Sequence, residues 1–311
     1  MRRLLPLWPL ALLLVGCPAP EAPLAEEPEP RPIPFPSISA APERLIAMGD
    51  VHGDFDAMMD ALIVAGVVDD GGTWIGGSTW VVQTGDQLDR GDQERQILDF
   101  LPGLADEAWA AGGALIVLNG NHEAMNVELD LRYVTDGGFD EFADLAPPED
   151  EQDAELLSYD PAERGRVAAF RPGGPYALQL AERNIAVVVG DSAFVHGGIA
   201  PDHAERGLER MNSEVQEWMR AEDDWPWILD GDGPLWIRDY SDETGPEECD
   251  DLAQTLDILG ISRLVVGHTV QSSINSECEE QVWRVDVGMA AYYGGSPEVL
   301  EIVGDDVSVL D

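Results

Sequence analysis

The sequence predicts a mixed α/β domain with more than one sheet. Two observations indicate this fold class. Short apolar runs end at glycine-rich turns that carry polar residues, and a segment with helical spacing follows each of the first two turns. Later in the chain several apolar runs follow one another with little room for helices between them. Strands that first alternate with helices and then come in quick succession are typical of such an α/β domain.

The first half of the chain predicts three strands and two helices. Apolar runs at 43–48 and 78–84 lead into the turns GDVHG and GDQLDRG, and a run at 114–118 leads into NGNHE. After the first turn, apolar residues recur at the spacing of about 3.6 residues that places them on one face of a helix. These residues are Phe55, Met58, Met59, Leu62 and Ile63. A second helix is predicted over 93–101.

The second half predicts four more strands and a cap. The strands are expected at 185–190, 192–195, 263–266 and 281–288. The second of them leads into HGG and the third into GHT. Residues 126–184 show no clear strand, so we expect a mostly helical cap near the site, and the acidic run PPEDEQDAE within it reads as a solvated loop.

The N-terminus has the features of a processed export signal. Basic residues precede a short apolar stretch that ends at Gly16 and Cys17, and this stretch is too short to span a bilayer as a helix. The ending resembles the lipobox of bacterial lipoproteins, which predicts residues 1–17 as a signal peptide and a lipid anchor at Cys17; an ordinary cleaved signal is the alternative. The protein is then expected to be exported and membrane-anchored, at the periplasmic face or the cell surface.

Two further segments complete the expected organisation. Residues 18–42 are rich in proline, so we expect an extended, solvated linker there, followed by one domain at 43–311. Apart from Cys17, the chain contains Cys249 and Cys278. In an exported protein these two form either a disulfide, which we favour, or two free thiols.

Charge excludes one class of partner. The chain carries 17 Lys and Arg against 61 Asp and Glu, a formal net charge of -44. Binding to nucleic acid requires basic patches that neutralise phosphates, so we expect no nucleic-acid partner. An anionic substrate would need a local source of positive charge.

Polar residues gather at the ends of the predicted strands. Four of the five histidines stand there, and only His203 does not. The complete set is Asp50, His52, Asp86, Asp89, Arg90, Asn121, His122, His196 and His268. In α/β folds such residues meet at one edge of the sheet. Carboxylate, imidazole and amide ligands suit Mn, Fe or Zn, and six of them are more than one ion needs. The pattern predicts two divalent ions about 3.5–4 Å apart that share a carboxylate.

The sequence motifs of these turns resemble those of a known superfamily. GDVHG, GDQLDRG, GNHE, HGG and GH, in this order, are similar to the motifs of the calcineurin-like metallophosphoesterases. The DRG and HGG spellings resemble the PPP-type branch, and GPLWIR, VVGHTVQ, VDVGMAAYYGG, DLRYV and AFRPGGP are similar to the bacterial Shewanella-like protein phosphatases. The resemblance covers 44–302 and implies a two-sheet β-sandwich flanked by helices (αββα), with a mostly helical cap inserted at about 126–184.

The resemblance also implies metal ligands. Asp50 and His52 would hold the first ion, and Asp86 would bridge both. Asn121, His196 and His268 would complete the second position. The two ions would be Mn, Fe or Zn.

Catalytic roles follow in the same way. His122 would be the general acid, oriented by Asp89. Arg90 and Arg238 would bind phosphate oxygens, although the sequence that flanks Arg238 differs from that of the protein phosphatases. Tyr293 would lie near the leaving group.

The expected function is a metal-dependent phosphomonoesterase, a PPP-like protein phosphatase that hydrolyses phosphoesters by metal-activated hydroxide. One alternative is hydrolysis of dinucleoside polyphosphates or other small phosphoesters, and a second is an inactive tethered binding protein. Arg132, Arg166 and Arg171 either line the site or offset acidic neighbours. Glu123 is expected to support its turn by hydrogen bonds.

Overall fold

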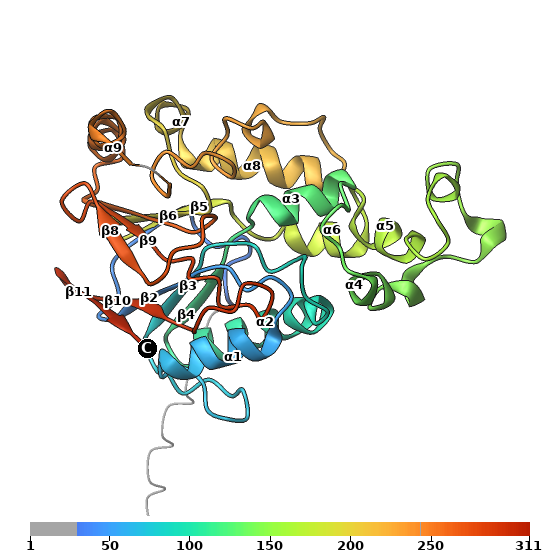
Figure 1. Cartoon of the computed structure of the whole chain (residues 1–311), viewed down its shortest axis with the longest axis horizontal. Helices are drawn as coiled ribbons and strands as arrows, with labels where there is room; N and C mark the ends of the chain where they lie inside the picture. The colour runs from blue at the N-terminus through green and yellow to red at the C-terminus, as the bar shows by residue number, and fades with distance from the viewer. Residues whose placement is uncertain (1–29, 243) are drawn as a thin grey trace, which may run out of the picture. The chain divides into compact units, whose positions relative to one another are not determined.

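The computed structural model describes residues 30–242 and 244–311, and residues 31–311 form one compact unit (Figure 1). The expected signal peptide, Cys17 and the first part of the expected linker lie outside the described residues, so they stay predictions. Within the described ranges, no helix combines the length and the apolar character needed to cross a membrane.

Two mixed sheets form the centre of the domain. The first has the strand order β1-β5-β6-β7-β9-β8 and the second the order β11-β10-β2-β3-β4. The first sheet contains β1 (Ile38–Ser39), β5 (Ala186–Val189), β6 (Ser192–Val195), β7 (Arg263–Val266), β8 (Asn275–Glu277) and β9 (Val282–Arg284). The second contains β2 (Leu45–Met48), β3 (Trp80–Gln83), β4 (Ala114–Val117), β10 (Val299–Val303) and β11 (Asp306–Leu310). The predicted two-sheet α/β fold is confirmed, and each predicted strand is present.

The core follows from the two-residue period of the strands. In β5, Val187 and Val189 pack into the cluster between the sheets, whereas Ala186 and Val188 pack on the opposite side. Successive side chains of a strand point to opposite faces, so the first sheet needs an apolar cover on both. The second sheet supplies one cover and helices supply the other.

Helices cover the outer faces of both sheets. The second sheet is covered by α1 (Phe55–Val64) and α2 (Glu94–Ala110), and the first by α7 (Pro201–Arg206), α8 (Leu208–Met219) and α9 (Pro246–Leu259) (Figure 1). Helix α1 begins where the side chain of Asp54 accepts a hydrogen bond from the Ala57 amide, which satisfies one of the free N–H groups of the first turn.

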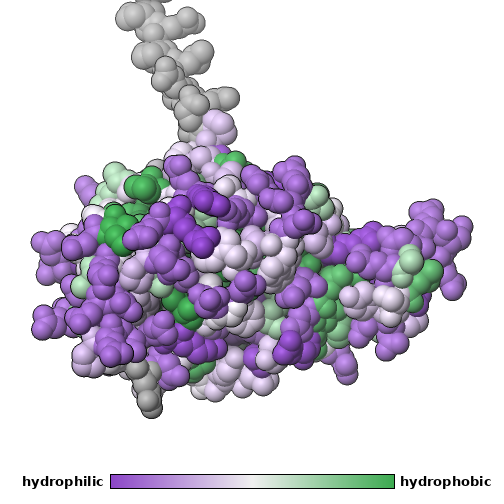
Figure 2. Space-filling view, turned by 90° about the horizontal axis from the view of Figure 1, so that it is seen from above, coloured by the Kyte–Doolittle hydropathy of each residue, from purple (hydrophilic) through white to green (hydrophobic). Residues whose placement is uncertain are grey.

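The cap is helical, as expected. Its elements are α4 (Asp136–Asp140), η1 (Ala143–Leu145), η2 (Glu149–Glu151), η3 (Leu156–Ser158), α5 (Arg164–Phe170) and α6 (Pro175–Leu180), and it follows α3 (Asn121–Glu128). Phe142, Phe170 and Tyr176 pack ring against ring and join the cap to the core under the first sheet. Figure 2 shows that hydrophilic residues dominate the face seen there, in keeping with the acidic composition.

The structure corrects the end of the expected linker. Ile38 and Ser39 pair in parallel with β5, and the ring of Phe35 meets Trp80 edge to face with centroids 5.5 Å apart. Asn184 donates a 2.7 Å hydrogen bond to the Phe35 carbonyl. A proline-rich segment can serve as an edge strand because its missing N–H groups face outward. Residues from about 31 to 42 are therefore part of the domain.

A disulfide joins Cys249 in α9 to Cys278 after β8. The pairing favoured from the sequence is present, and it ties a helix to the turn between β8 and β9. A short helix, η4 (Trp227–Leu229), lies in the Trp-rich stretch before α9.

Candidate active site

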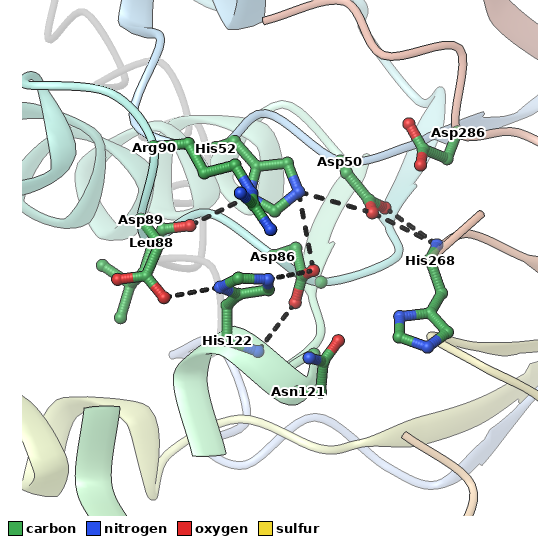
Figure 3. Close-up of polar contacts among 12 residues, drawn as sticks. Asp50, His52, Asp86, Leu88, Asp89, Arg90, Asn121, His122, His268 and Asp286 are labelled. Carbon is green, nitrogen blue, oxygen red and sulfur yellow. Dashed lines mark hydrogen bonds and ion pairs between the residues drawn. The ribbon is translucent and has the colours of Figure 1, made fainter. Parts of the chain in front are cut away.

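Strand register brings the site residues together. Met48 of β2 lies beside Gln83 of β3, which lies beside Val117 of β4, so three parallel strands end at the same level. In the first sheet Val195 and Val266 end β6 and β7 in the same way. The polar residues that follow these five strands gather in one buried group, most of which Figure 3 labels.

Asp86 lies at the centre of this group. Its Oδ2 is 3.7 Å from Nε2 of His52, 3.8 Å from Nε2 of His122 and 3.2 Å from Nε2 of His196. Two sets of potential metal ligands share it: His52, Asp86 and His122 in one, and Asp86, His196 and His268 in the other. A carboxylate common to two adjacent ligand sets is the arrangement that a bridged pair of cations requires.

A backbone carbonyl fixes the tautomer of His52. Its Nδ1 lies 3.0 Å from the Leu88 carbonyl (Figure 3). A carbonyl only accepts, so Nδ1 carries the proton and the lone pair of Nε2 faces the carboxylates of Asp50 and Asp86. Burial lowers the pKa of His52 to about 4, so this ring is neutral at neutral pH.

His196 and His268 are fixed by the same device. Nδ1 of His196 is 3.1 Å from the Thr84 carbonyl, and Nε2 of His268 is 3.2 Å from the Trp236 carbonyl. The two remaining nitrogens lie 3.0 Å apart, and burial followed by the charge of His196 lowers the pKa of His268. Two lone pairs at this distance do not form a hydrogen bond in the neutral rings. A cation between them removes the conflict, so the donor set fits a bound metal.

Asn121 completes this half of the group. Its Oδ1 is 2.8 Å from Nε2 of His196, and its Nδ2 is directed at the sulfur of Met125. The amide oxygen is another acceptor directed at the same point. Asp50 closes the opposite side, with both carboxylate oxygens 3.2 and 3.4 Å from the amide of His268.

His122 forms a dyad with Asp89. Its Nδ1 lies 2.5 Å from Oδ2 of Asp89, while its backbone amide donates to Oδ1 of Asp86 at 3.0 Å. Burial alone would lower the pKa of His122, but the charges of Asp86 and Asp89 and the bond to Asp89 raise it. The ring is therefore held with Nε2 turned toward Asp86, at 3.8 Å from its Oδ2.

Glu123 explains why the fourth strand ends in Asn-Gly-Asn-His-Glu. Its buried carboxylate accepts four backbone hydrogen bonds, from Gly120 at 2.7 Å, Asp86 and Gln87 at 2.8 Å, and Leu88 at 3.1 Å. These bonds tie the start of α3 to the loop after β3. At Gly120 an added Cβ would lie 2.2 Å from Oδ1 of Asp86, so only glycine fits. The expected support of the turn by Glu123 is confirmed.

The site backbone is held in uncommon conformations. Among the described non-glycine residues with positive φ are His52, Asp86, Asp89, Arg90 and His268, with φ between 40° and 73°. Such conformations cost about 1–3 kcal/mol each and persist only where the surroundings enforce them. The hydrogen bonds to Glu123 are one such constraint.

Asp286 is a site residue that the sequence analysis did not identify. It follows β9, is 2% exposed, and lies next to Asp50 (Figure 3). Burial raises its pKa to about 6, and burial together with the charges of Asp286 and Asp86 raises the pKa of Asp50. Its position inside the predicted strand at 281–288, as the acidic residue of an otherwise mostly apolar run, was the available signal.

Arg90 lies at the mouth of the site among three tyrosines. Its guanidinium is 4.3 Å from the ring of Tyr133, 4.9 Å from Tyr292 and 5.7 Å from Tyr293. It donates to the Tyr292 hydroxyl at 3.2 Å, whereas its buried Nε has no partner among the described residues. Tyr293 lies over His52 with ring centroids 5.4 Å apart. The predicted Tyr293 thus lies at the site, and Tyr292 and Tyr133 were missed.

A cleft of about 590 Å³ opens beside Arg90, lined in part by Asp54, Asp56, Asp92 and Asp136.

On the opposite side of the site, Arg238 donates to the His268 carbonyl at 2.9 Å and to Oγ1 of Thr269 at 2.6 Å. Both predicted phosphate-binding arginines therefore lie next to predicted ligands.

Arg132, Arg166 and Arg171, which the sequence left as either site residues or partners of acidic neighbours, have different positions. Arg171 pairs with Asp153 and Glu155 in the cap, and Arg132 pairs with Asp130 at the surface. Neither pairing involves a ligand. Arg166 is fully buried behind Asp89.

Comparison with known proteins gives a consistent result. A family model described as calcineurin-like phosphoesterase matches residues 43–272. The chain is 40% identical over 297 residues to Shewanella-like protein phosphatase 2 of Arabidopsis thaliana, covering 85% of this chain and 76% of that protein. A solved cold-active protein tyrosine phosphatase superposes with a TM-score of 0.73 at 27% identity, over 88% of this chain and 78% of that one. A cold-active protein tyrosine phosphatase of a psychrophilic Shewanella gives a TM-score of 0.69 at 27% identity, over 89% and 83%.

Proposed function

The chain belongs to the calcineurin-like phosphoesterase family, and we propose that it is a dinuclear metal-dependent protein phosphatase that acts on phosphotyrosine. The observation that carries the proposal is the position of Asp86, whose carboxylate is common to two sets of ligand atoms. Relatives named as Shewanella-like protein phosphatases support phosphorylated proteins as the substrate class.

Six side chains would hold the metals. Asp50, whose Oδ2 lies 3.9 Å from Nε2 of His52, would form the first position with His52 and Asp86. His122, the third residue of that geometric set, would be the proton donor instead. Asn121, His196 and His268 would form the second with Asp86. Two divalent ions, Mn, Fe or Zn, would supply positive charge to the phosphate and lower the pKa of a water molecule to roughly 7.

The protein's own groups perform the remaining steps. His122 donates a proton from Nε2 to the departing oxygen, since its Nδ1 is engaged by Asp89. Arg90 binds phosphate oxygens through the guanidinium atoms that its neighbours leave available. Arg238, beside His268, does the same from the other side. No covalent intermediate with a side chain is required.

The tyrosine rim favours an aromatic leaving group. Tyr133, Tyr292 and Tyr293 are 37%, 61% and 38% exposed, so they present ring surface at the site mouth. Aromatic side chains stack on one another for about 0.5–1.5 kcal/mol beyond area burial. The solved relatives are named as protein tyrosine phosphatases.

The test compares two peptides of one sequence that differ only in phosphotyrosine or phosphoserine. We expect turnover in Mn²⁺, none in EDTA, and a higher kcat/KM for phosphotyrosine. Equal rates would refute the tyrosine preference, and full activity in EDTA would refute the metal mechanism. Faster hydrolysis of a dinucleoside polyphosphate would favour a hydrolase of small phosphoesters. An inactive protein that still binds phosphopeptide would favour a tethered binding protein.

We also propose that the protein is exported and anchored by lipid at Cys17. The disulfide between Cys249 and Cys278 supports this location, because disulfides persist in oxidising compartments. Mass spectrometry of the mature N-terminus, with Cys17→Ser as the comparison, tests it. An unmodified Cys17, or a Cys17→Ser protein that still fractionates with membranes, would contradict the anchor.

A further inference from the structure

We propose that Arg166, together with Asn126, is a positioning residue for proton donation by His122. It would act by fixing the carboxylate of Asp89. This inference rests on the proposed phosphatase function. It assigns a catalytic purpose to the cap helix α5, which carries Arg166.

Every nitrogen of the Arg166 guanidinium is engaged. Nε donates to Oδ1 of Asn126 at 2.8 Å, Nη1 donates to the Gly138 carbonyl at 3.0 Å, and both Nη atoms contact the carboxylate of Glu94. Nη2 also lies 3.4 Å from Oδ1 of Asp89. The side chain is 0% exposed. A planar guanidinium held at this many points has one orientation.

The same network fixes both oxygens of Asp89. Oδ2 faces Nδ1 of His122, and Oδ1 accepts from Asn126 at 3.1 Å and from Arg166. The backbone amide of Asp89 is bound by Glu94. Asn126 also donates to the His122 carbonyl at 2.9 Å. The plane of the Asp89 carboxylate, and hence the direction of the imidazole, is therefore set by residues from α2, α3 and α5.

Charge makes Arg166 necessary at this place. Asp89 and Glu94 are both 0% exposed, and Arg166 contacts both. Two buried carboxylates that lose their shared counter-ion repel each other and adopt a new geometry. That change would alter the orientation of Asp89, which is the partner of Nδ1 of His122.

The inference predicts a dependence on the leaving group. Phenolate, with a pKa near the ~10 of tyrosine, leaves poorly unless it receives a proton. Nitrophenolate is far more stable as an anion and needs little help. A defect in proton donation therefore slows phenyl phosphate more than p-nitrophenyl phosphate, whereas a general structural defect slows both equally.

The variants are Arg166→Lys and Asn126→Ala, with Arg95→Lys as the matched control. Arg95 also joins α2 to the cap, through the Glu141 carbonyl at 2.8 Å and through Asp144. Its hydrogen bonds and ion pairs within the described part of the chain do not reach Asp89. All proteins are full-length and loaded with Mn²⁺, and metal content and thermal unfolding are measured for each. Asn126→Ala keeps the test valid should Arg166→Lys fail to fold.

We expect kcat for phenyl phosphate to fall about 10- to 100-fold more than kcat for p-nitrophenyl phosphate in both test variants, with an unchanged ratio in Arg95→Lys. When either substitution is added to His122→Ala, kcat for phenyl phosphate should fall no further relative to kcat for p-nitrophenyl phosphate. An equal loss on both substrates, or an additive loss in the double variants, would overturn the inference while leaving the proposed function intact. A wild-type protein without phosphatase activity would overturn both.

Discussion

Nε2 of His196 lies 3.0 Å from Nδ1 of His268, and in the neutral rings neither nitrogen carries a proton for the other. The carbonyls of Thr84 and Trp236 take the protons on the far sides of the two rings. With these tautomers the contact is between two acceptors, and a cation between them removes the repulsion.

This relationship predicts a metal-dependent stability. Saturating Mn²⁺ or Zn²⁺ should raise the unfolding temperature relative to EDTA, since a ligand at about 100 times its Kd stabilises by ~2.7 kcal/mol. His268→Ala should reduce the bound metal from two ions to one. His203→Gln is the control, because His203 is buried elsewhere, where it accepts from the Ala200 amide. Elemental analysis and thermal unfolding check both points; two ions in His268→Ala would contradict the assignment.

The dyad of His122 and Asp89 predicts a separation of binding from turnover. His122→Ala should keep its metals and lose about 10²–10⁴-fold in kcat on an unactivated phosphoester. Asp86→Asn should lose metal as well, because the shared carboxylate contacts both ligand sets. Near-normal turnover by His122→Ala would show that another group is the acid.

Asp286 predicts how metal affinity depends on pH. Its raised pKa of about 6, beside an Asp50 whose pKa burial also raises, means that the metal-free site retains a proton to a higher pH than free aspartate does. A cation displaces that proton, so affinity should increase with pH and level off above about pH 6.

The variant Asp286→Asn removes a negative charge next to Asp50. The pKa of Asp50 should then fall toward its ordinary value, and the rise in affinity should move to lower pH. Calorimetric titration with Mn²⁺ between about pH 5 and pH 8 measures both curves. Coincident curves would show that Asp286 does not influence the ligand.

The acidic cleft beside Arg90 predicts a preference for basic substrates. Asp56, Asp92 and Asp136 are among the residues that line it. A phosphotyrosyl peptide with lysines next to the phosphotyrosine should have a lower KM than the same peptide with glutamates. The difference should shrink at high salt, because exposed charges are screened over about 8–10 Å.

Asp56→Asn tests the cleft with little risk to the fold, since its side chain is exposed. Asp54 is unsuitable, as it caps α1 and accepts a 2.7 Å bond from the Ala291 amide. The preference should weaken in Asp56→Asn without a change in kcat. If the ratio of KM for the lysine peptide to KM for the glutamate peptide stayed unchanged, Asp56 would not contribute to the preference.

The disulfide predicts a stability effect without a catalytic one. Replacing Cys249 and Cys278 by serine should lower the free energy of unfolding by about 3–4 kcal/mol, as expected for a loop closed across 29 residues. Turnover should be unchanged, because the bridge joins α9 to a turn outside the ligand group. Denaturant unfolding with and without reductant measures the effect; loss of metal in the variant would contradict the separation.

The ligands could be predicted from the sequence because each directly follows a buried strand. Parallel register then places such residues together with few alternatives, as for Asp50 and Asp86. The central strands of both sheets could be predicted because they too are buried apolar runs that end in polar turns. Edge strands were harder: β1 has two residues in a proline-rich segment, and β8 is the polar triplet NSE.

Residues that act through tertiary contacts could not be predicted. Asp286 stands alone after its strand, and Tyr292 is an exposed residue of a glycine-rich loop. Arg166 and Arg171 belong to one short stretch, yet one is buried behind Asp89 and the other pairs with cap acids. Only the packing of the cap distinguishes them.

The strand β1 has a consequence for solubility. Amides of Val188 and Gly190 donate to the carbonyls of Ser37 and Ser39, so the outer edge of β5 is covered by a short segment that ends there. An uncovered strand edge is a template for pairing with another chain. A chain shortened to begin at residue 43 would present that edge and Trp80, without Phe35 over it, to its own copies. Residues 31–42, as the first part of the domain, therefore protect the molecule from aggregation.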